Sequence, residues 1–243
     1  TAPDLGTMKP ASVDSIISVS RQQLPRTAAD TVSAIENELA AVRDSSQMAA
    51  VFTRLADVWQ RHKQFRPAFY YRAKAAKLEN SEKSLTFAGQ LFLELLEREG
   101  DRSLQMWEAN EAVAVLEKAV ALNGNNEEAK LAMAAAYIQG TPEPMKGVQM
   151  LLAITREKPD DVPANLLLGR MSIQSGQFDK AVKRFETVLK TEPQNKEALY
   201  FLAQAYEGQG NKTKAIELLE QCKKVVNNPE FTKDIDAHIN SLK

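Results

Sequence analysis

The chain has 243 residues, of which 44% are apolar and 26% are charged, as in an ordinary globular protein. Its 31 Lys and Arg residues balance 32 Asp and Glu residues, so bulk charge offers no attraction to nucleic acid or to anionic lipid. Aromatic residues make up only 7%, and strong helix formers such as Ala, Leu, Glu and Lys dominate, which favours an all-α fold.

The composition also argues against two further features. The sequence has no uninterrupted apolar run of about 18 residues, so we expect no direct membrane insertion of this chain. Cys222 is the only cysteine, which rules out an internal disulfide and a cysteine-based metal cluster. We expect Cys222 to be a small buried residue on a helix.

The first ten residues, TAPDLGTMKP, are rich in Pro and Gly and poor in large apolar residues. This composition is typical of a linker or a disordered N-terminus over residues 1–10. The segment could follow a removed signal or anchor, which would place the domain in the periplasm of a bacterium, or it could belong to a cytoplasmic protein. The sequence leaves the compartment open.

Residues 11–48 contain two apolar stripes at helical spacing, separated by the helix breaker Pro25. The stripes consist of Val13, Ile16 and Ile17, and then of Val32, Ile35, Leu39 and Val42. We expect two helices that form an N-terminal helical cap or a degenerate repeat.

The C-terminal half of the chain repeats with a period of 34 residues. The spacing joins Leu168 to Leu202, Gly176 to Gly210, and Ala181 to Ala215. A Gly favours the positive φ that ends a helix at a tight turn, and small residues let two helices approach closely. Each repeat therefore predicts two antiparallel helices, and neighbouring pairs must stack because one pair cannot bury its own apolar face.

This pattern resembles the tetratricopeptide repeat (TPR) family. The residues that carry the resemblance are Leu168, Gly169, Gly176, Phe178, Ala181, Phe185 and Pro193, and then Leu202, Ala203, Tyr206, Gly210, Ala215 and Leu219. The resemblance covers about residues 49–229. It implies an all-α, right-handed superhelical TPR solenoid of helix-turn-helix repeats with N- and C-terminal capping helices.

Extending the frame backward predicts five repeats, at 49–81, 82–126, 127–161, 162–195 and 196–229. Residues 230–243 are predicted as a C-terminal capping helix with one apolar face. The second repeat is about eleven residues longer than the 34-residue period. Met106 and Trp107 lie in the excess and either pack inside a longer helix or project as a contact surface; we favour packing.

No catalytic constellation is present in the sequence. It contains no HExxH, no phosphate-cradling Gly-rich loop and no G-x-S-x-G. Of the two histidines, we expect His62 to be exposed or partly packed and His238 to be solvated on the polar flank of the last helix. We predict no enzymatic activity and no cofactor, with one alternative: a non-catalytic part of a larger enzyme whose catalytic domain is absent from this chain.

The resemblance implies that the first helix of each repeat lines a concave groove. The hypothesis places these residues in the groove: Asp57, Gln90, Leu131, Ile138, Leu166, Arg170, Ile173, Tyr200 and Gln204. Arg170 and Tyr200 are the best anchors, since Arg and Tyr often dominate the energetics of interfaces. An alternative for Leu131, Ile138 and Ile173 is contact with neighbouring helices of the array itself.

We therefore expect a protein-protein interaction scaffold or adaptor that binds a partner peptide or helix. Short basic runs are interleaved with acids, so we expect no nucleic acid partner, and association with a second copy of the chain is left open. The clamp residues of chaperone-binding TPR domains are absent. The last three repeats also resemble TPR domains of cytochrome c maturation proteins, which leaves an envelope assembly factor as an alternative.

Overall fold

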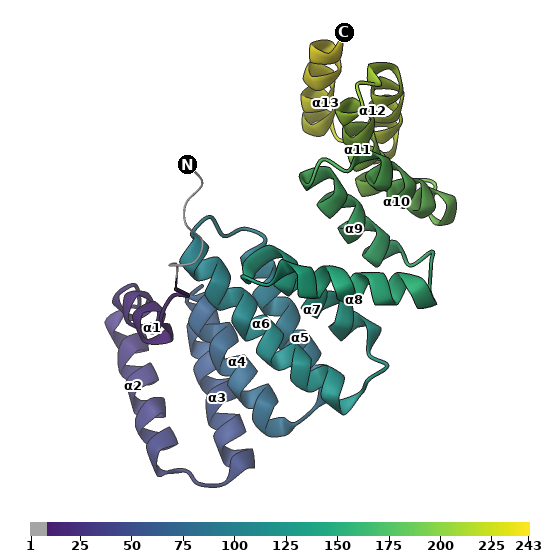
Figure 1. Ribbon diagram of the computed structural model, residues 1–243. Helices are drawn as coiled ribbons and strands as arrows, with labels where there is room; N and C mark the ends of the chain where they lie inside the picture. The colour runs from purple at the N-terminus through teal and green to yellow at the C-terminus, as the bar shows by residue number, and fades with distance from the viewer. Residues whose placement is uncertain (1–8) are drawn as a thin grey trace. The chain divides into compact units, whose positions relative to one another are not determined.

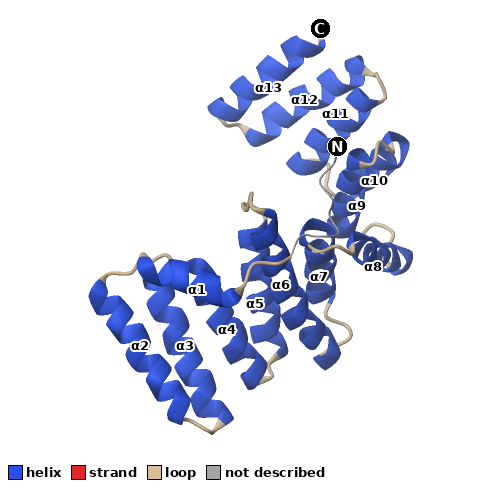
Figure 2. Ribbon diagram, turned by 60° about the vertical axis from the view of Figure 1, so that its left-hand side comes forward, coloured by secondary structure: helices blue, strands red, loops and turns tan. Residues whose placement is uncertain are grey.

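The computed structural model describes residues 9–243, which form thirteen α-helices and no strand within that range (Figure 1, Figure 2). The all-α prediction is confirmed. The linker predicted over residues 1–10 lies, for residues 1–8, outside the described part of the chain. The helices are α1 Val13–Gln22, α2 Arg26–Ala41, α3 Ser45–Arg61, α4 Phe65–Glu79, α5 Glu82–Leu96, α6 Arg102–Leu122, α7 Glu127–Gly140, α8 Pro144–Glu157, α9 Val162–Gln174, α10 Phe178–Thr191, α11 Lys196–Gly208, α12 Lys212–Val226 and α13 Pro229–Leu242.

The chain divides into two compact units, residues 1–147 and 148–243. The N-terminal unit contains α1 to α7, the C-terminal unit contains α9 to α13, and α8 crosses the boundary. The division into five repeats stays a prediction.

The two N-terminal helices pack on the first hairpin. α2 lies against α3, and α1 lies against α4. Arg21 of α1 donates to both carboxylate oxygens of Glu36 on α2, at 2.7 and 2.8 Å, and its guanidinium lies over the ring of Trp59 on α3. Because α1 packs on the second helix of the α3–α4 hairpin, this arrangement supports a cap rather than a further repeat.

Two hairpins, α3–α4 and α5–α6, form the body of the N-terminal unit. Gly89 of α5 lies directly against Leu116 of α6, so that a Cβ at this position would overlap the Leu116 side chain. α3 begins at Ser45, four residues before the predicted start of the first repeat. The earlier start follows from Asp44, whose side chain accepts a hydrogen bond from the Gln47 amide at 2.8 Å and caps the helix.

The excess length of the second predicted repeat forms part of a long helix. α6 has 21 residues, and both Met106 and Trp107 are buried in it. The Trp107 ring meets the Phe92 ring edge-on, with centroids 5.6 Å apart. The packing interpretation of these two residues is confirmed.

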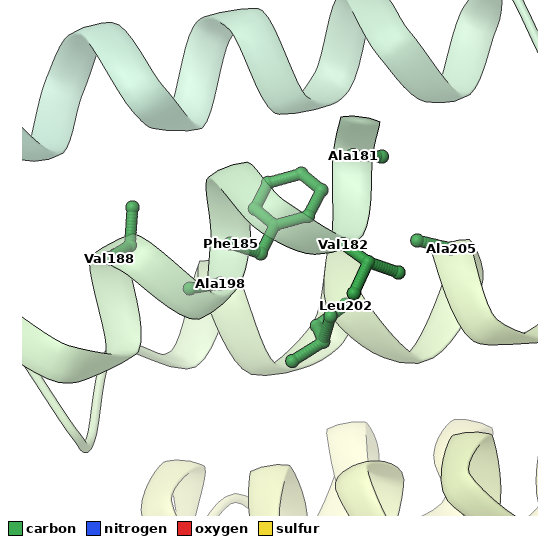
Figure 3. Packing of buried hydrophobic residues seen from close by; sticks show 7 residues of the cluster. All are labelled: Ala181, Val182, Phe185, Val188, Ala198, Leu202 and Ala205. Atoms are coloured by element: carbon green, nitrogen blue, oxygen red, sulfur yellow. The ribbon is translucent and has the colours of Figure 1, made fainter. Parts of the chain in front are cut away.

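The C-terminal unit shows the repeat geometry most clearly. Gly176 and Gly210 end the turns after α9 and α11 with φ values of 70° and 78°, in the region that favours glycine. Phe185 of α10 is fully buried in a cluster with Ala181, Val182, Val188, Ala198, Leu202 and Ala205 (Figure 3). The small residues predicted to allow close helix approach therefore lie in the core.

The last helix, α13, packs against α12. Its Ile235, Ile239 and Leu242 join a buried cluster with Ala203, Ala215 and Leu219. This contact confirms the predicted C-terminal capping helix. Cys222 of α12 is fully buried, as expected.

Candidate partner-binding site

Helices α9 and α11 carry five of the predicted groove residues and lie beside each other. α9 also packs closely on α10, because Gly169 of α9 makes room for the ring of Phe185. Asp161 and Asn195 cap the two helices by accepting hydrogen bonds from backbone amides in the first turn, at 2.8 and 2.9 Å. The first turns of both helices are thus fixed by the sequence.

Arg170 of α9 is the most exposed of these five residues. Its guanidinium lies over the ring of Phe201 on α11, 5.3 Å from the ring centroid. The carboxylate of Glu197, also on α11, is 3.6 Å from Arg170 Nη1, and both side chains keep more than two fifths of their surface exposed. Phe201 stacks in turn on Phe185, with centroids 5.9 Å apart and an interplanar angle of 18°. The guanidinium therefore rests on a stack of two rings that reaches the core.

Leu166 and Ile173 flank Arg170 along α9. Both are partly buried and pack against the cluster around Phe185. For Ile173, the contact with neighbouring helices that the sequence left as an alternative is present. Each side chain still keeps some exposed surface, so both roles are compatible with its position.

Tyr200 and Gln204 belong to α11 and are partly exposed. Tyr200 packs against the cluster that α13 forms with α11 and α12, and its ring meets Phe201 edge-on. Tyr200 therefore helps to hold α13 in place as well as offering part of its ring to solvent. Gln204 lies outside the two buried clusters of this unit described above.

The other four predicted residues lie in the N-terminal unit. Asp57 is paired with Arg72 of α4 at 2.7 Å, and Gln90 donates to Glu128 at 2.5 Å, so both polar groups have partners within the unit. The remaining two, Leu131 and Ile138 of α7, are partly buried. Ile138 lies next to Gly147, which agrees with the alternative that it contacts a neighbouring helix.

Sequence reasoning missed several residues of these surfaces. Phe87 of α5 has 52% of its surface exposed, although it is a large apolar residue. It lies three residues before Gln90 on α5, and Gln90 was assigned to the groove, so this helical spacing was the available signal. Glu197 and Phe201, which hold Arg170, have no signal in a single helix because they come from the next repeat.

The two histidines differ from each other. His62 is exposed, as expected. His238 is not simply solvated: its Nε2 lies 2.9 Å from Glu207 Oε2 on α11. The expectation for His238 is therefore wrong, because α13 folds back on α11 and brings the ring to a carboxylate. The carboxylate of Glu207 is therefore paired with His238.

One acid is fully buried in the N-terminal unit. Arg66 of α4 donates to Glu108 of α6 at 2.8 Å and also pairs with Glu99. Burial raises the pKa of Glu108, and the Arg66 guanidinium opposes that rise. Among the described residues, the second carboxylate oxygen of Glu108 has no hydrogen-bond partner. Since these helices pack directly on each other, the cluster has a structural role.

Within residues 9–243, no group of three or more His, Cys, Asp or Glu side chains could hold a metal ion. Over the same range, no helix is long and apolar enough to cross a membrane.

Comparison with known proteins supports the fold. Residues 172–231 match the model of the tetratricopeptide repeat family. The curated proteins contain no match to the sequence. Among solved structures, TTC0263, a thermophilic TPR protein of Thermus thermophilus, is 17% identical with a TM-score of 0.56, over 80% of this chain and 98% of that one.

Two further structures share the fold. YrrB, described as a TPR protein with an unusual peptide-binding site, is 17% identical with a TM-score of 0.50, over 78% of this chain and 92% of that one. PilW, described as a type IV pilus biogenesis factor, is 17% identical with a TM-score of 0.53, over 80% of this chain and 93% of that one.

The architecture is thus that of a protein built from stacked helical hairpins. Residues 172–231 thus match the tetratricopeptide repeat family, and the chain shares the fold of solved TPR proteins.

Proposed function

We propose that the chain is a non-enzymatic scaffold and that α9 and α11 bind a segment of a protein partner. The observation that carries the proposal is Arg170, an exposed guanidinium held on an aromatic ring of the adjacent helix. Arginine and tyrosine are enriched among the residues that dominate binding energy. Leu166 and Ile173 lie one helical turn before and after Arg170 on α9, Tyr200 lies on the adjacent α11, and their partly exposed apolar groups offer area for burial.

The shared fold with YrrB agrees with peptide recognition, because that structure is described as having a peptide-binding site. At 17% identity the similarity shows the fold alone, so the proposal rests on the residues of this chain. In the N-terminal unit, we propose Asp57, Gln90, Leu131 and Ile138 as secondary contacts. The polar partners of Asp57 and Gln90 make these two residues weaker candidates than Arg170.

Site-specific photo-cross-linking tests the proposal. A photoreactive amino acid replaces Gln204 on α11 in one variant and Lys183, an exposed residue of α10, in the control. We expect covalent capture of the same protein from the native organism at position 204 and none at position 183. The captured protein is then purified and its binding is measured with both variants; equal capture at the two positions would refute the assignment of the site.

The sequence also left open an envelope assembly factor and a part of a larger enzyme. No feature of residues 9–243 favours either one over a general scaffold. The identity of the protein cross-linked at position 204 distinguishes them, since a secreted or membrane protein supports the first and a catalytic subunit supports the second.

A further inference from the structure

The guanidinium of Arg170 has unused hydrogen-bonding capacity. An arginine carries five N–H donors in a planar fork. Among residues 9–243, Arg170 makes no hydrogen bond, and its nearest acid, Glu197, is 3.6 Å away. By contrast, Arg21 and Arg72 each donate to a carboxylate at 2.7 Å.

The same group is already held in place. The ring of Phe201 lies under the guanidinium, and Phe201 rests on the fully buried Phe185. Stacking on an aromatic face stabilises an arginine and limits the orientations of its fork. A ligand that binds there loses less conformational entropy than one that must first order a free side chain.

Glu197 does not saturate this arginine. It lies in the first turn of α11, where the helix dipole favours a negative charge whether or not Arg170 is near. Its carboxylate is beyond hydrogen-bonding distance, so a second carboxylate could reach the open edge of the guanidinium and form two parallel hydrogen bonds. The other acid of this surface, Glu207, is already paired with His238.

We propose that Arg170 binds the carboxylate of an Asp or Glu side chain within the partner segment. Apolar side chains of that segment would cover Leu166 and Ile173 on either side. This inference rests on the proposed function of α9 and α11 and adds the chemistry of the recognised group. The occupant is therefore a peptide segment with an internal acidic residue among apolar ones.

The test uses a display library of random 12-residue peptides against the full chain. Four proteins are screened: wild type, Arg170→Glu, the matched control Lys183→Glu on α10, and Gln204→Trp, which obstructs the proposed site. We expect wild type and Lys183→Glu to enrich peptides with Asp or Glu at one position. Arg170→Glu should lose these peptides and enrich Lys or Arg at the same position, and Gln204→Trp should enrich neither.

A thermodynamic cycle then measures the interaction. The best peptide and its amide version, with Glu replaced by Gln or Asp by Asn, are titrated against wild type and Arg170→Gln. We expect the amide peptide to bind wild type about tenfold more weakly, which corresponds to about 1.4 kcal/mol, because the amide cannot form the charge-assisted hydrogen bonds of a carboxylate. Binding of the amide peptide should be nearly the same for both proteins. Arg170→Gln removes the charge and keeps a polar side chain without introducing an acid, so it serves if Arg170→Glu fails to fold.

The outcomes separate the two proposals. The carboxylate inference is wrong if the enriched peptides are lost with Gln204→Trp but share no acidic position. It is also wrong if those peptides bind Arg170→Glu as well as they bind wild type. In both cases the proposed binding site is still supported. If no enriched peptide depends on Gln204, both the site and the inference are wrong.

Discussion

Adding one methyl group at Gly169 tests how the core supports the candidate site. In Gly169→Ala, the new Cβ would lie 2.5 Å from Cζ and 2.6 Å from Cε1 of Phe185. Carbon atoms in contact prefer about 3.5–4.0 Å, so the ring must move. Phe185 is fully buried and stacked on Phe201, so a displaced ring must push against its neighbours.

The size of the effect follows from two opposing terms. Overpacking of a filled core costs about 1–3 kcal/mol. The better helix propensity of alanine offsets about 0.5–1 kcal/mol of this cost. We expect Gly169→Ala to lower the free energy of unfolding by about 1–2 kcal/mol. In a Phe185→Leu background the clash is relieved, so the same change should become neutral or slightly stabilising.

Urea unfolding followed by far-UV circular dichroism measures this coupling in the two backgrounds. Tryptophan fluorescence reports on the N-terminal unit alone, because Trp59 and Trp107 both belong to it, and so serves as a reference for the effect in the C-terminal unit. A shifted Phe185 also displaces the ring beneath Arg170, so Gly169→Ala should weaken peptide binding. An equal loss of stability from Gly169→Ala in both backgrounds would refute the proposed clash.

Four further outcomes follow from the contacts. Asn195→Ala removes the cap of α11 and should cost about 1 kcal/mol in urea unfolding followed by circular dichroism. Trp107→Ala should cost about 3–5 kcal/mol in the same assay, because the ring is buried against Phe92. Burial raises the pKa of Glu108 in the folded chain, so the carboxyl of the unfolded chain ionises first as the pH rises from about 4.5. Wild type should therefore lose stability relative to Glu108→Gln as the pH rises above this value, as measured by tryptophan fluorescence during urea unfolding. Cys222 is buried and its pKa is raised, so it should react with a thiol reagent only after urea unfolds the chain.

The elements that packing dictates could be predicted from the sequence. Gly176 and Gly210 adopt the positive φ that the turn requires, and Ala181 and Ala215 are fully buried. These positions accept few residue types, so the sequence records them directly. The long α6 was harder to place because its extra residues are buried but have no counterpart in the 34-residue period.

The surface could be predicted only in part. Position along a first helix identifies Arg170 and Gln204 as candidates, but it does not reveal which side chains of the following helix meet them. His238 shows the same limit: its helix was predicted, and its partner Glu207 comes from 31 residues earlier in the chain. Contacts of this kind depend on how helices stack, and helical periodicity within one segment does not contain that information.

Arg170 and Tyr200 looked equivalent as anchors in the sequence, and the structure separates them. Tyr200 packs into the cluster that holds α13, so Tyr200→Ala should reduce both stability and binding. A loss of binding in that variant would therefore not identify a contact with the partner. Arg170 supports no buried cluster with its charged end, and its loose pairing with Glu197 stabilises the fold by at most about 1 kcal/mol. We therefore expect charge reversal at Arg170 to cause little change in folding, so this position tests the proposed binding with little disturbance of the fold.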